Sequence, residues 1–202
     1  MLILAADTSL PILSVALLRD GALLGATALE GRSSRNEKLL PAIDWLLGET
    51  SIDRRAIDIF AVTRGPGSFT GVRIGLATMQ GMALALGKPV CAMSTHEAIA
   101  PVRGRWVVVD DAGRGEFYVS MFVDGQETVT PRLERDLARF EGERLVLADV
   151  QQSGNVALAC ARRAAAIAAA GRLDQYSDIT PIYVRLAEAD VKLQSKSPSS
   201  RA

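Results

Sequence analysis

The order of apolar and polar residues along this chain predicts strands first and a mixture of helices and strands afterwards. Residues 2–6 are uniformly apolar, and two further strand-like runs follow at 13–18 and 22–29. Asp20-Gly21 lies between these two runs, and Asp-Gly suits a tight hairpin turn that needs positive φ at both central residues. We therefore expect three antiparallel strands at the start of the chain.

Apolar residues at helical spacing predict two longer helices, at residues 36–48 and 70–86. Pro41 lies within the first of them and either kinks it or marks its first turn. An alanine-rich run at 156–170 predicts a third helix. The shorter elements predicted between these helices are strands at 57–63 and 89–93 and a helix at 95–100.

Residues 106–125 repeat the plan of the first three strands. An apolar strand again ends in carboxylates, at Asp110 and Asp111, and Asp124-Gly125 again follows the next strand, at 117–123. The repeat predicts two halves of one α/β architecture, each a mixed sheet with helices on its faces. The expected divisions are an N-terminal subdomain at 1–103, a smaller C-terminal subdomain at 104–186 and a disordered polar tail at 187–202.

Composition limits the classes of function. The 23 lysines and arginines balance the 23 aspartates and glutamates, so no global field draws the chain to nucleic acid. Cys91 and Cys160 lie far apart in apolar surroundings, which is typical of buried free thiols in a cytosolic protein. Asp7 interrupts the first apolar run, so neither a signal peptide nor a membrane contact is expected.

A glycine-rich motif joins the strand at 57–63 to the helix at 70–86. Such a turn can hold an anion with its free N–H groups, or it can serve close packing. The Walker pattern is excluded because no Lys-Ser/Thr follows Gly71, and the Rossmann fingerprint is excluded by the glycine spacing. Ser68 and Thr70 are candidate caps of the helix. The motif consists of Arg64, Gly65, Pro66, Gly67, Ser68, Phe69, Thr70, Gly71, Val72 and Arg73.

This motif resembles the TsaB (YeaZ) family of bacterial tRNA threonylcarbamoyladenosine synthesis. The resemblance covers residues 1–186 and implies an actin-like, ribonuclease-H-like duplicated fold, with a mixed five-stranded sheet, flanking helices and a reduced second half. The chain departs from the family at Gly113, where a basic residue is frequent, and in its short second half. The other segments that carry the resemblance are Asp7 to Ser9, Asn36 to Asp44, Asp111 to Tyr118 and Pro181 to Arg185.

The resemblance implies a non-catalytic partner subunit without a cofactor. Its expected partners are the catalytic paralogue TsaD and the ATPase TsaE, and the tRNA is reached through their complex, at adenosine 37 of tRNAs that read ANN codons. Alone, the chain is expected to form a homodimer. Two other classes stay open: a small nucleotide-binding phosphotransferase or ATPase, and a peptidase.

A degenerate nucleotide site is one candidate, because the position of Asp7 orients a metal-bound water in nucleotide-using members of the superfamily. The alternative is that Asp7 caps the turn after its own strand. An adenosine pocket would be expected near residues 148–157, where only Gly154-Asn155 is suitable. The candidate residues are Asp7, Thr8, Ser9 and Asp111, with Asp110 as an alternative to Asp111.

Neither a metal site nor a nucleophile is predicted. His96 is the single histidine, and one imidazole cannot build a multi-histidine metal site. Ser94 is close to it in sequence, but residues two apart do not face each other on a helix, and a third orienting group is not evident. The peptidase is therefore the least favoured class.

Small residues on the 70–86 helix suggest a close helix contact. Gly71 and Gly75, and again Gly81 and Ala85, are four residues apart, and each mid-helix glycine costs about 1 kcal/mol relative to alanine. The seam packs either on the protein's own sheet or on a partner, and Trp45 lies off the apolar stripe of its helix. The predicted partner interface consists of Leu39, Ile43, Trp45, Gly71, Val72, Gly75, Met79 and Met82.

Four arginines are candidates for contact with phosphate or tRNA. With a formal net charge of zero, each is equally consistent with a solvated or salt-bridged surface group. The four are Arg64, Arg73, Arg114 and Arg185.

Overall fold

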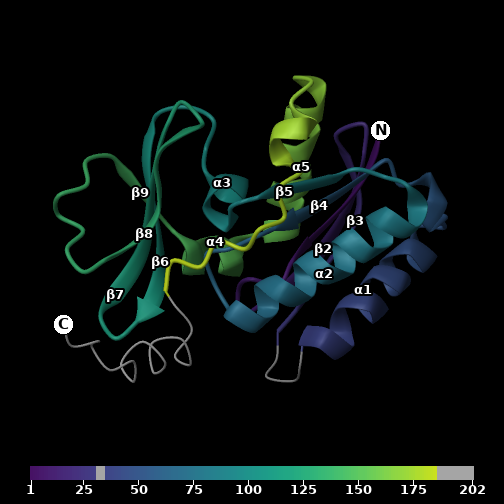
Figure 1. Ribbon diagram of the computed structural model, residues 1–202, viewed down its shortest axis with the longest axis horizontal. Coiled ribbons are helices and arrows are strands. Elements are labelled where there is room, and N and C mark those ends of the chain that lie inside the picture. Colours follow the sequence, from purple (N-terminus) through teal and green to yellow (C-terminus); the bar gives the residue numbers. More distant parts are fainter. Residues whose placement is uncertain (31–34, 186–202) are drawn as a thin grey trace, which may run out of the picture.

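The computed structural model describes residues 1–30 and 35–185 (Figure 1). Within these residues the strands form two sheets, one with the order β3-β2-β1-β4-β5 and one with the order β8-β7-β6-β9. The predicted tail at 187–202 lies outside the described residues.

The first sheet is built as the sequence predicts. β1 (Leu2–Asp7), β2 (Leu13–Arg19) and β3 (Ala22–Leu29) are antiparallel, and β4 (Ile59–Thr63) and β5 (Val90–Met93) extend the sheet in parallel to β1. The hairpin turn has φ of 50° at Asp20 and 82° at Gly21. Glycine adopts such positive angles without a steric penalty, which is why Asp-Gly marks this turn.

The second sheet repeats this plan with one strand fewer. β6 (Arg105–Gly113), β7 (Glu116–Val123) and β8 (Gln126–Glu134) are antiparallel, and β9 (Glu143–Val146) is parallel to β6. No helix forms in the connection at 135–142, which corresponds to the segment that carries α1 in the first half. The predicted duplication and the reduced second half are therefore confirmed.

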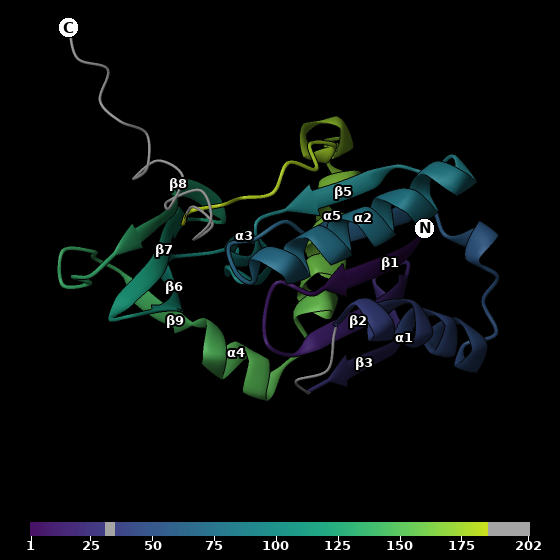
Figure 2. The ribbon, with the colours of Figure 1, turned by 60° about the horizontal axis from the view of Figure 1, so that its bottom comes forward.

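Helices cover both faces of the first sheet. α1 (Arg35–Glu49) and α2 (Phe69–Leu86) lie side by side on one face, and α3 (Thr95–Ile99) and α5 (Val156–Ala169) lie on the other (Figures 1 and 2). Alternate residues of each strand serve these two layers, because strand side chains point to opposite faces. The remaining helical segments are η1 (Arg54–Ala56), α4 (Leu147–Ser153) and η2 (Leu173–Tyr176). None of the described helices is long and apolar enough to cross a membrane.

The predicted assignment of all of 104–186 to the second subdomain needs one correction. α5 packs against the first sheet, where Ala157, Cys160 and Ala164 share a buried cluster with Ile3 and Ala5 of β1. Small side chains let the helix lie close to the strands. The chain then crosses back as an extended strap at 177–185, which runs from η2 to the β6–β7 turn (Figure 1).

Candidate functional site

The turn after β1 is sealed inside the protein. Asp7, Thr8 and Ser9 are 0%, 0% and 1% exposed. The Asp7 Oδ1 atom accepts hydrogen bonds from the Ser9 backbone N–H (3.2 Å), the Ser9 hydroxyl (2.6 Å) and the Thr63 hydroxyl (2.5 Å). Asp7 thus caps its own turn, which is the alternative to the nucleotide role.

The glycine-rich motif closes over this turn. The Ser68 N–H donates to the Ser9 carbonyl (2.6 Å), and the Thr8 hydroxyl donates to the Gly71 carbonyl (2.6 Å). A Cβ atom on Gly67, Gly71 or Gly75 would lie well under 3.0 Å from Ser9 or Thr8. These glycines are therefore required for close packing, and the prediction that Gly71 and Gly75 form an intermolecular seam is wrong.

The start of α2 uses its own polar groups internally. Ser68 is the N-cap, as predicted, and its side chain accepts from the Gly71 N–H at 3.2 Å. The Val72 N–H donates to the Ser68 carbonyl at 2.9 Å. N–H groups at helix starts can hold an anion when they are free, and these already donate within the chain.

Burial controls the two acids nearest to the turn. It raises the pKa of Asp7, against the hydrogen bonds from Ser9 and Thr63, and the Asp7 Oδ2 atom is buried without a hydrogen bond among the described residues. Asp110, at the end of β6, has its pKa raised to about 6, mainly by burial and further by the charges of Asp111 and Asp7. The sequence offered Asp110 only as an alternative, yet it is the acid whose charge interacts with Asp7.

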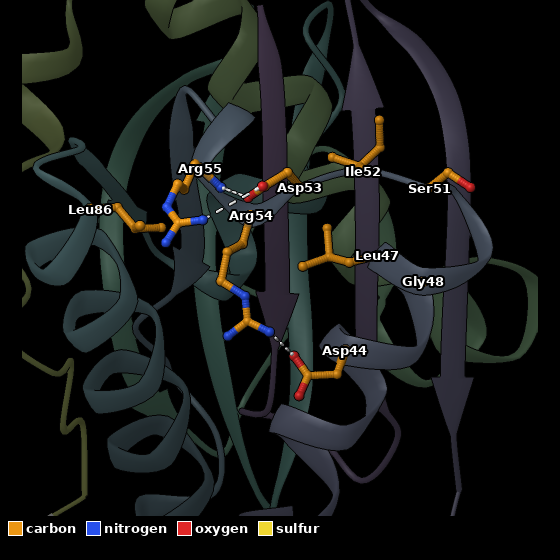
Figure 3. Close-up of a pocket in the computed structure, with 9 residues that line it drawn as sticks. All are labelled: Asp44, Leu47, Gly48, Ser51, Ile52, Asp53, Arg54, Arg55 and Leu86. Atoms are coloured by element: carbon orange, nitrogen blue, oxygen red, sulfur yellow. Dashed lines mark hydrogen bonds and ion pairs between the residues drawn. The ribbon is translucent and has the colours of Figure 1, made fainter.

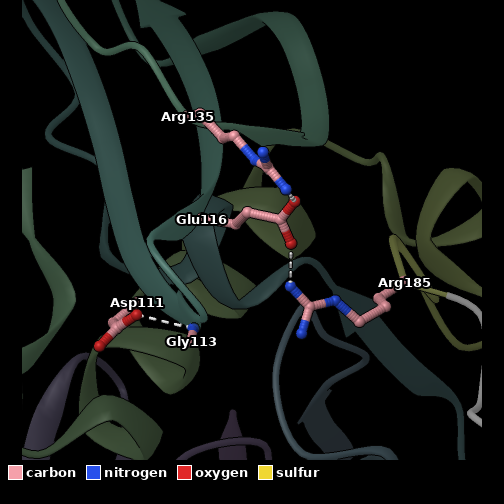
Figure 4. Close-up of polar contacts among 5 residues, drawn as sticks. All are labelled: Asp111, Gly113, Glu116, Arg135 and Arg185. Atoms are coloured by element: carbon pink, nitrogen blue, oxygen red, sulfur yellow. Dashed lines mark hydrogen bonds and ion pairs between the residues drawn. The ribbon is translucent and has the colours of Figure 1, made fainter.

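Asp111 does not join a site with Asp7. It is exposed, and its Oδ1 atom accepts the Gly113 N–H at 2.7 Å, so it shapes the β6–β7 turn (Figure 4). The predicted grouping of Asp7, Thr8, Ser9 and Asp111 around a nucleotide is thus not formed in this structure. Residues 148–157, where an adenosine pocket was expected, are occupied by α4 and the start of α5.

Most of the predicted partner interface lies in the protein's own core. Met82 is half-buried against that core, and of the predicted set only Trp45 is mainly exposed, at 54%. The correction has a simple cause: helical spacing shows which residues share a side, and here that side faces the first sheet. The residues buried there are Leu39, Ile43, Gly71, Val72, Gly75 and Met79.

Other residues of α1 and α2 form an exposed apolar face. Leu84 is 81% exposed and Leu40 is 48% exposed. Gly81 is exposed, with nothing within 4 Å of an added Cβ atom. We call this face the outer helical surface; it consists of Leu40, Trp45, Ala77, Gly81, Leu84 and Ala85.

A groove of about 750 Å³ lies at the carboxyl ends of α1 and α2 (Figure 3). Leu47, Ile52 and Leu86 contribute apolar side chains to it. Arg54 pairs with Asp44 at 3.1 Å across its rim. Its arginines and carboxylates are balanced, so the groove offers no strong charge to a ligand.

Two of the four candidate arginines are salt-bridged, as one alternative held. Arg64 contacts Asp178 (3.0 Å) and the Thr180 carbonyl (3.1 Å) on the strap. Arg185 pairs with Glu116, which also pairs with Arg135 at 3.0 Å (Figure 4).

The other two candidates differ from them. Arg114 is exposed at the β6–β7 turn, with a φ of 62°. Arg73 contacts aromatic side chains: its guanidinium lies 3.9 Å from the Phe69 ring centroid, and its Nε donates to the Tyr183 hydroxyl at 2.6 Å. The contact with Tyr183 joins residues 110 positions apart and has no signal in the sequence.

His96 is a structural tie between the two halves. It is fully buried, and its Nδ1 atom lies 2.7 Å from the Ser120 hydroxyl of β7. Burial lowers its pKa to about 3, so the ring is neutral. Ser94 caps α3 and does not address the ring. In the ranges 1–30 and 35–185, no three potential ligand groups come together for a metal ion.

Comparisons with known proteins agree with this architecture. The family model of TsaD, tRNA N6-adenosine threonylcarbamoyltransferase, matches residues 32–169. An uncharacterized protein of Mycobacterium tuberculosis is 30% identical over 196 residues, which cover 93% of each chain. The structure of YeaZ from Pseudomonas aeruginosa superposes with a TM-score of 0.72 at 26% identity and covers 90% of this chain and 99% of that one. The predicted actin-like α/β fold is confirmed.

Two relatives carry a functional name. The tRNA threonylcarbamoyladenosine biosynthesis protein TsaB of Bacillus subtilis is 32% identical over 127 residues, covering 60% of this chain and 55% of that protein. TsaB of Escherichia coli is 36% identical over 126 residues, covering 58% and 53%. The aligned segment thus spans about half the length of these two proteins.

Proposed function

The chain belongs to the TsaD family, as a member of its TsaB (YeaZ) group, and we propose that it is a non-catalytic subunit that binds and activates a TsaD paralogue. It serves the biosynthesis of threonylcarbamoyladenosine in tRNA, in the cytoplasm. TsaE and tRNA meet it within that complex. The buried, internally hydrogen-bonded turn at Asp7 supports an accessory role rather than a phosphotransferase.

The observation that carries this proposal is the outer helical surface. Trp45 and Leu84 expose 54% and 81% of their surface on two adjacent helices of the same layer. Contiguous exposed apolar side chains of this kind mark protein interaction sites. Gly81, flanked one turn away by Ala77 and Ala85, leaves room for a partner helix to approach closely.

The same surface accounts for two kinds of partner. A second copy of the chain would meet it through a two-fold axis, with the same patch on both sides. A paralogue with the same arrangement of helices would replace that copy. We therefore expect the homodimer and the TsaD complex to be mutually exclusive, with the TsaD complex as the functional state.

Binding to the TsaD paralogue of the same organism tests the proposal. Trp45→Ala removes the largest exposed side chain of the surface, and Gly81→Leu fills its open space. A central tryptophan typically costs 2 kcal/mol or more when truncated, so we expect affinity to fall at least about tenfold. Val102→Ala is the matched control, because Val102 is 64% exposed but lies outside α1 and α2.

Isothermal titration gives the affinity, and thermal melts on the same samples show whether each variant is folded. Gly81→Leu should melt no lower than the wild type, since leucine is the better helix former. Undiminished TsaD binding by both folded variants would contradict the outer helical surface as the interface.

A further inference from the structure

A small groove lies where the two halves and the strap meet. Pro66, Gly67 and Phe69 come from the glycine-rich motif, Tyr118 comes from β7, and Tyr183 and Arg185 come from the strap. We call it the aromatic groove. Its volume is about 190 Å³, the liquid volume of about six water molecules. It therefore admits one small group and excludes a helix or a strand.

Aromatic rings are concentrated at this groove. The chain has five phenylalanines, three tyrosines and two tryptophans, and three of these ten residues line this one groove. The Phe69 and Tyr183 ring centroids are 4.6 Å apart with the planes tilted by 30°. Tyr183 is 36% exposed, so part of its ring is available for stacking with a planar ligand.

Positive charge flanks the rings. The Arg73 guanidinium lies 5.5 Å from the Tyr183 ring centroid, and Arg73 is in none of the described ion pairs. On the other side, Arg185 and Arg135 share the single carboxylate of Glu116, which leaves one excess positive charge. A planar ring with a neighbouring anion matches both features.

We propose that the aromatic groove receives one unstacked base of single-stranded RNA, with an adjacent phosphate on Arg73 or Arg185. The inference rests on the proposed function, since a tRNA loop presents unpaired bases that aromatic rings and arginine planes can stack on. A formal net charge of zero gives weak attraction to phosphates in general. Stacking therefore has to supply the binding, and paired RNA should be a poor ligand.

Fluorescence anisotropy of the full chain with two RNA probes tests this. The first probe is a fluorescein-labelled oligoadenylate of about ten nucleotides, within the usual single-strand site sizes, and the second is the same strand paired with oligouridylate. We expect the single strand to bind at least tenfold more tightly than the duplex. Tyr183→Ala should weaken single-strand binding about 5-fold to 100-fold.

Two further variants separate the ring from the charge. Tyr183→Phe keeps the ring and should retain most of the binding. Arg73→Gln should lower the salt dependence, by up to about one unit of slope for one phosphate contact. Arg172→Gln is the matched control, because Arg172 lies over another ring, that of Tyr176, at 5.9 Å, and should change nothing.

Three results would overturn the inference. They are equal affinity for the duplex, no anisotropy change at about 10⁻⁴ M protein, the weak end of non-specific binding, and unchanged binding by a folded Tyr183→Ala variant. The TsaD titration is run in parallel on the same variants. Loss of TsaD binding with intact RNA binding in Tyr183→Ala would also overturn it, whereas failure of the wild type to bind TsaD would count against the proposed function alone.

Discussion

The turns that follow β1 and β6 occupy the same place in the two halves, yet one is sealed and the other is open. Asp7 is 0% exposed, whereas Asp110 is half-buried and Asp111 is exposed. Both turns follow an apolar strand that ends in carboxylates and begins a hairpin. The difference therefore does not come from the strands.

It comes from the helix that follows the parallel strand in each half. β4 leads into the glycine-rich motif and α2, whose glycine side presses on Thr8 and Ser9. β9 leads into α4, which has no side-chain cap and packs Leu147 against Val108 and Phe122. Duplication kept the strands, and the glycines decide whether the carboxylates can meet solvent.

Gly71→Ala should have the largest effect, because it breaks the seal at its tightest point. The added Cβ atom would overlap the Thr8 backbone carbonyl, so the end of β1 or the start of α2 must move. Overpacking usually costs 1–3 kcal/mol, and a backbone clash places this variant at or above about 3 kcal/mol. Urea unfolding followed by circular dichroism measures the loss.

Gly81→Ala is the matched control on the same helix. Its Cβ atom meets nothing within 4 Å, so only helix propensity changes, and the variant should gain up to about 1 kcal/mol. Equal losses in Gly71→Ala and Gly81→Ala would show that the two glycines do not differ in the way the comparison requires.

Gly75→Ala should cost less and should be repairable. The atom in its way is the Thr8 hydroxyl oxygen, not backbone. We expect a loss of about 1–3 kcal/mol for Gly75→Ala and about 1 kcal/mol for Thr8→Ala, which gives up one hydrogen bond to the Gly71 carbonyl. In the double variant the clash is gone, so its loss should be smaller than the sum by 1 kcal/mol or more.

The same double-mutant cycle with Gly71 provides the contrast. Thr8→Ala leaves the Thr8 carbonyl in place, so it should not rescue Gly71→Ala. Simple additivity in the Gly75 cycle would contradict direct contact between this glycine and Thr8.

Much of the fold could be predicted because its signals are local. Both Asp-Gly hairpins, the two long helices and the parallel strands follow from periodicity and turn chemistry. The placement of α5 on the first sheet could not be predicted in this way, since an alanine-rich helix packs on either sheet.

The candidate site was harder for a related reason. Four-residue spacing places Gly71 with Gly75 and Gly81 with Ala85, but it does not say which pair faces inward. α2 is apolar nearly all round, with Leu84 exposed and Leu76 buried, so it has no polar face to orient it. Contacts such as Arg73 with Tyr183 arise only when the strap returns across the motif.

Asp110→Asn should have the smallest effect and would sharpen the comparison at the open turn. Burial raises the pKa of Asp110 to about 6 from an ordinary value of 3.8. A raised pKa means that the ionised form is disfavoured in the folded state. The stabilising contribution of the protonated form is thus complete below about pH 3.8 and is lost as the pH rises through about 6.

Asparagine cannot ionise, so the variant should gain stability relative to the wild type as the pH rises from 4 to 7. Two pKa units would correspond to at most about 3 kcal/mol, and because Asp110 is only half-buried we expect about 1 kcal/mol at pH 7. Urea unfolding of both proteins at pH 4, 5, 6 and 7 gives the difference directly. A difference that stays constant over this range would mean that solvent already reaches Asp110 freely. The open turn would then differ from the sealed one more sharply than the half-burial of Asp110 indicates.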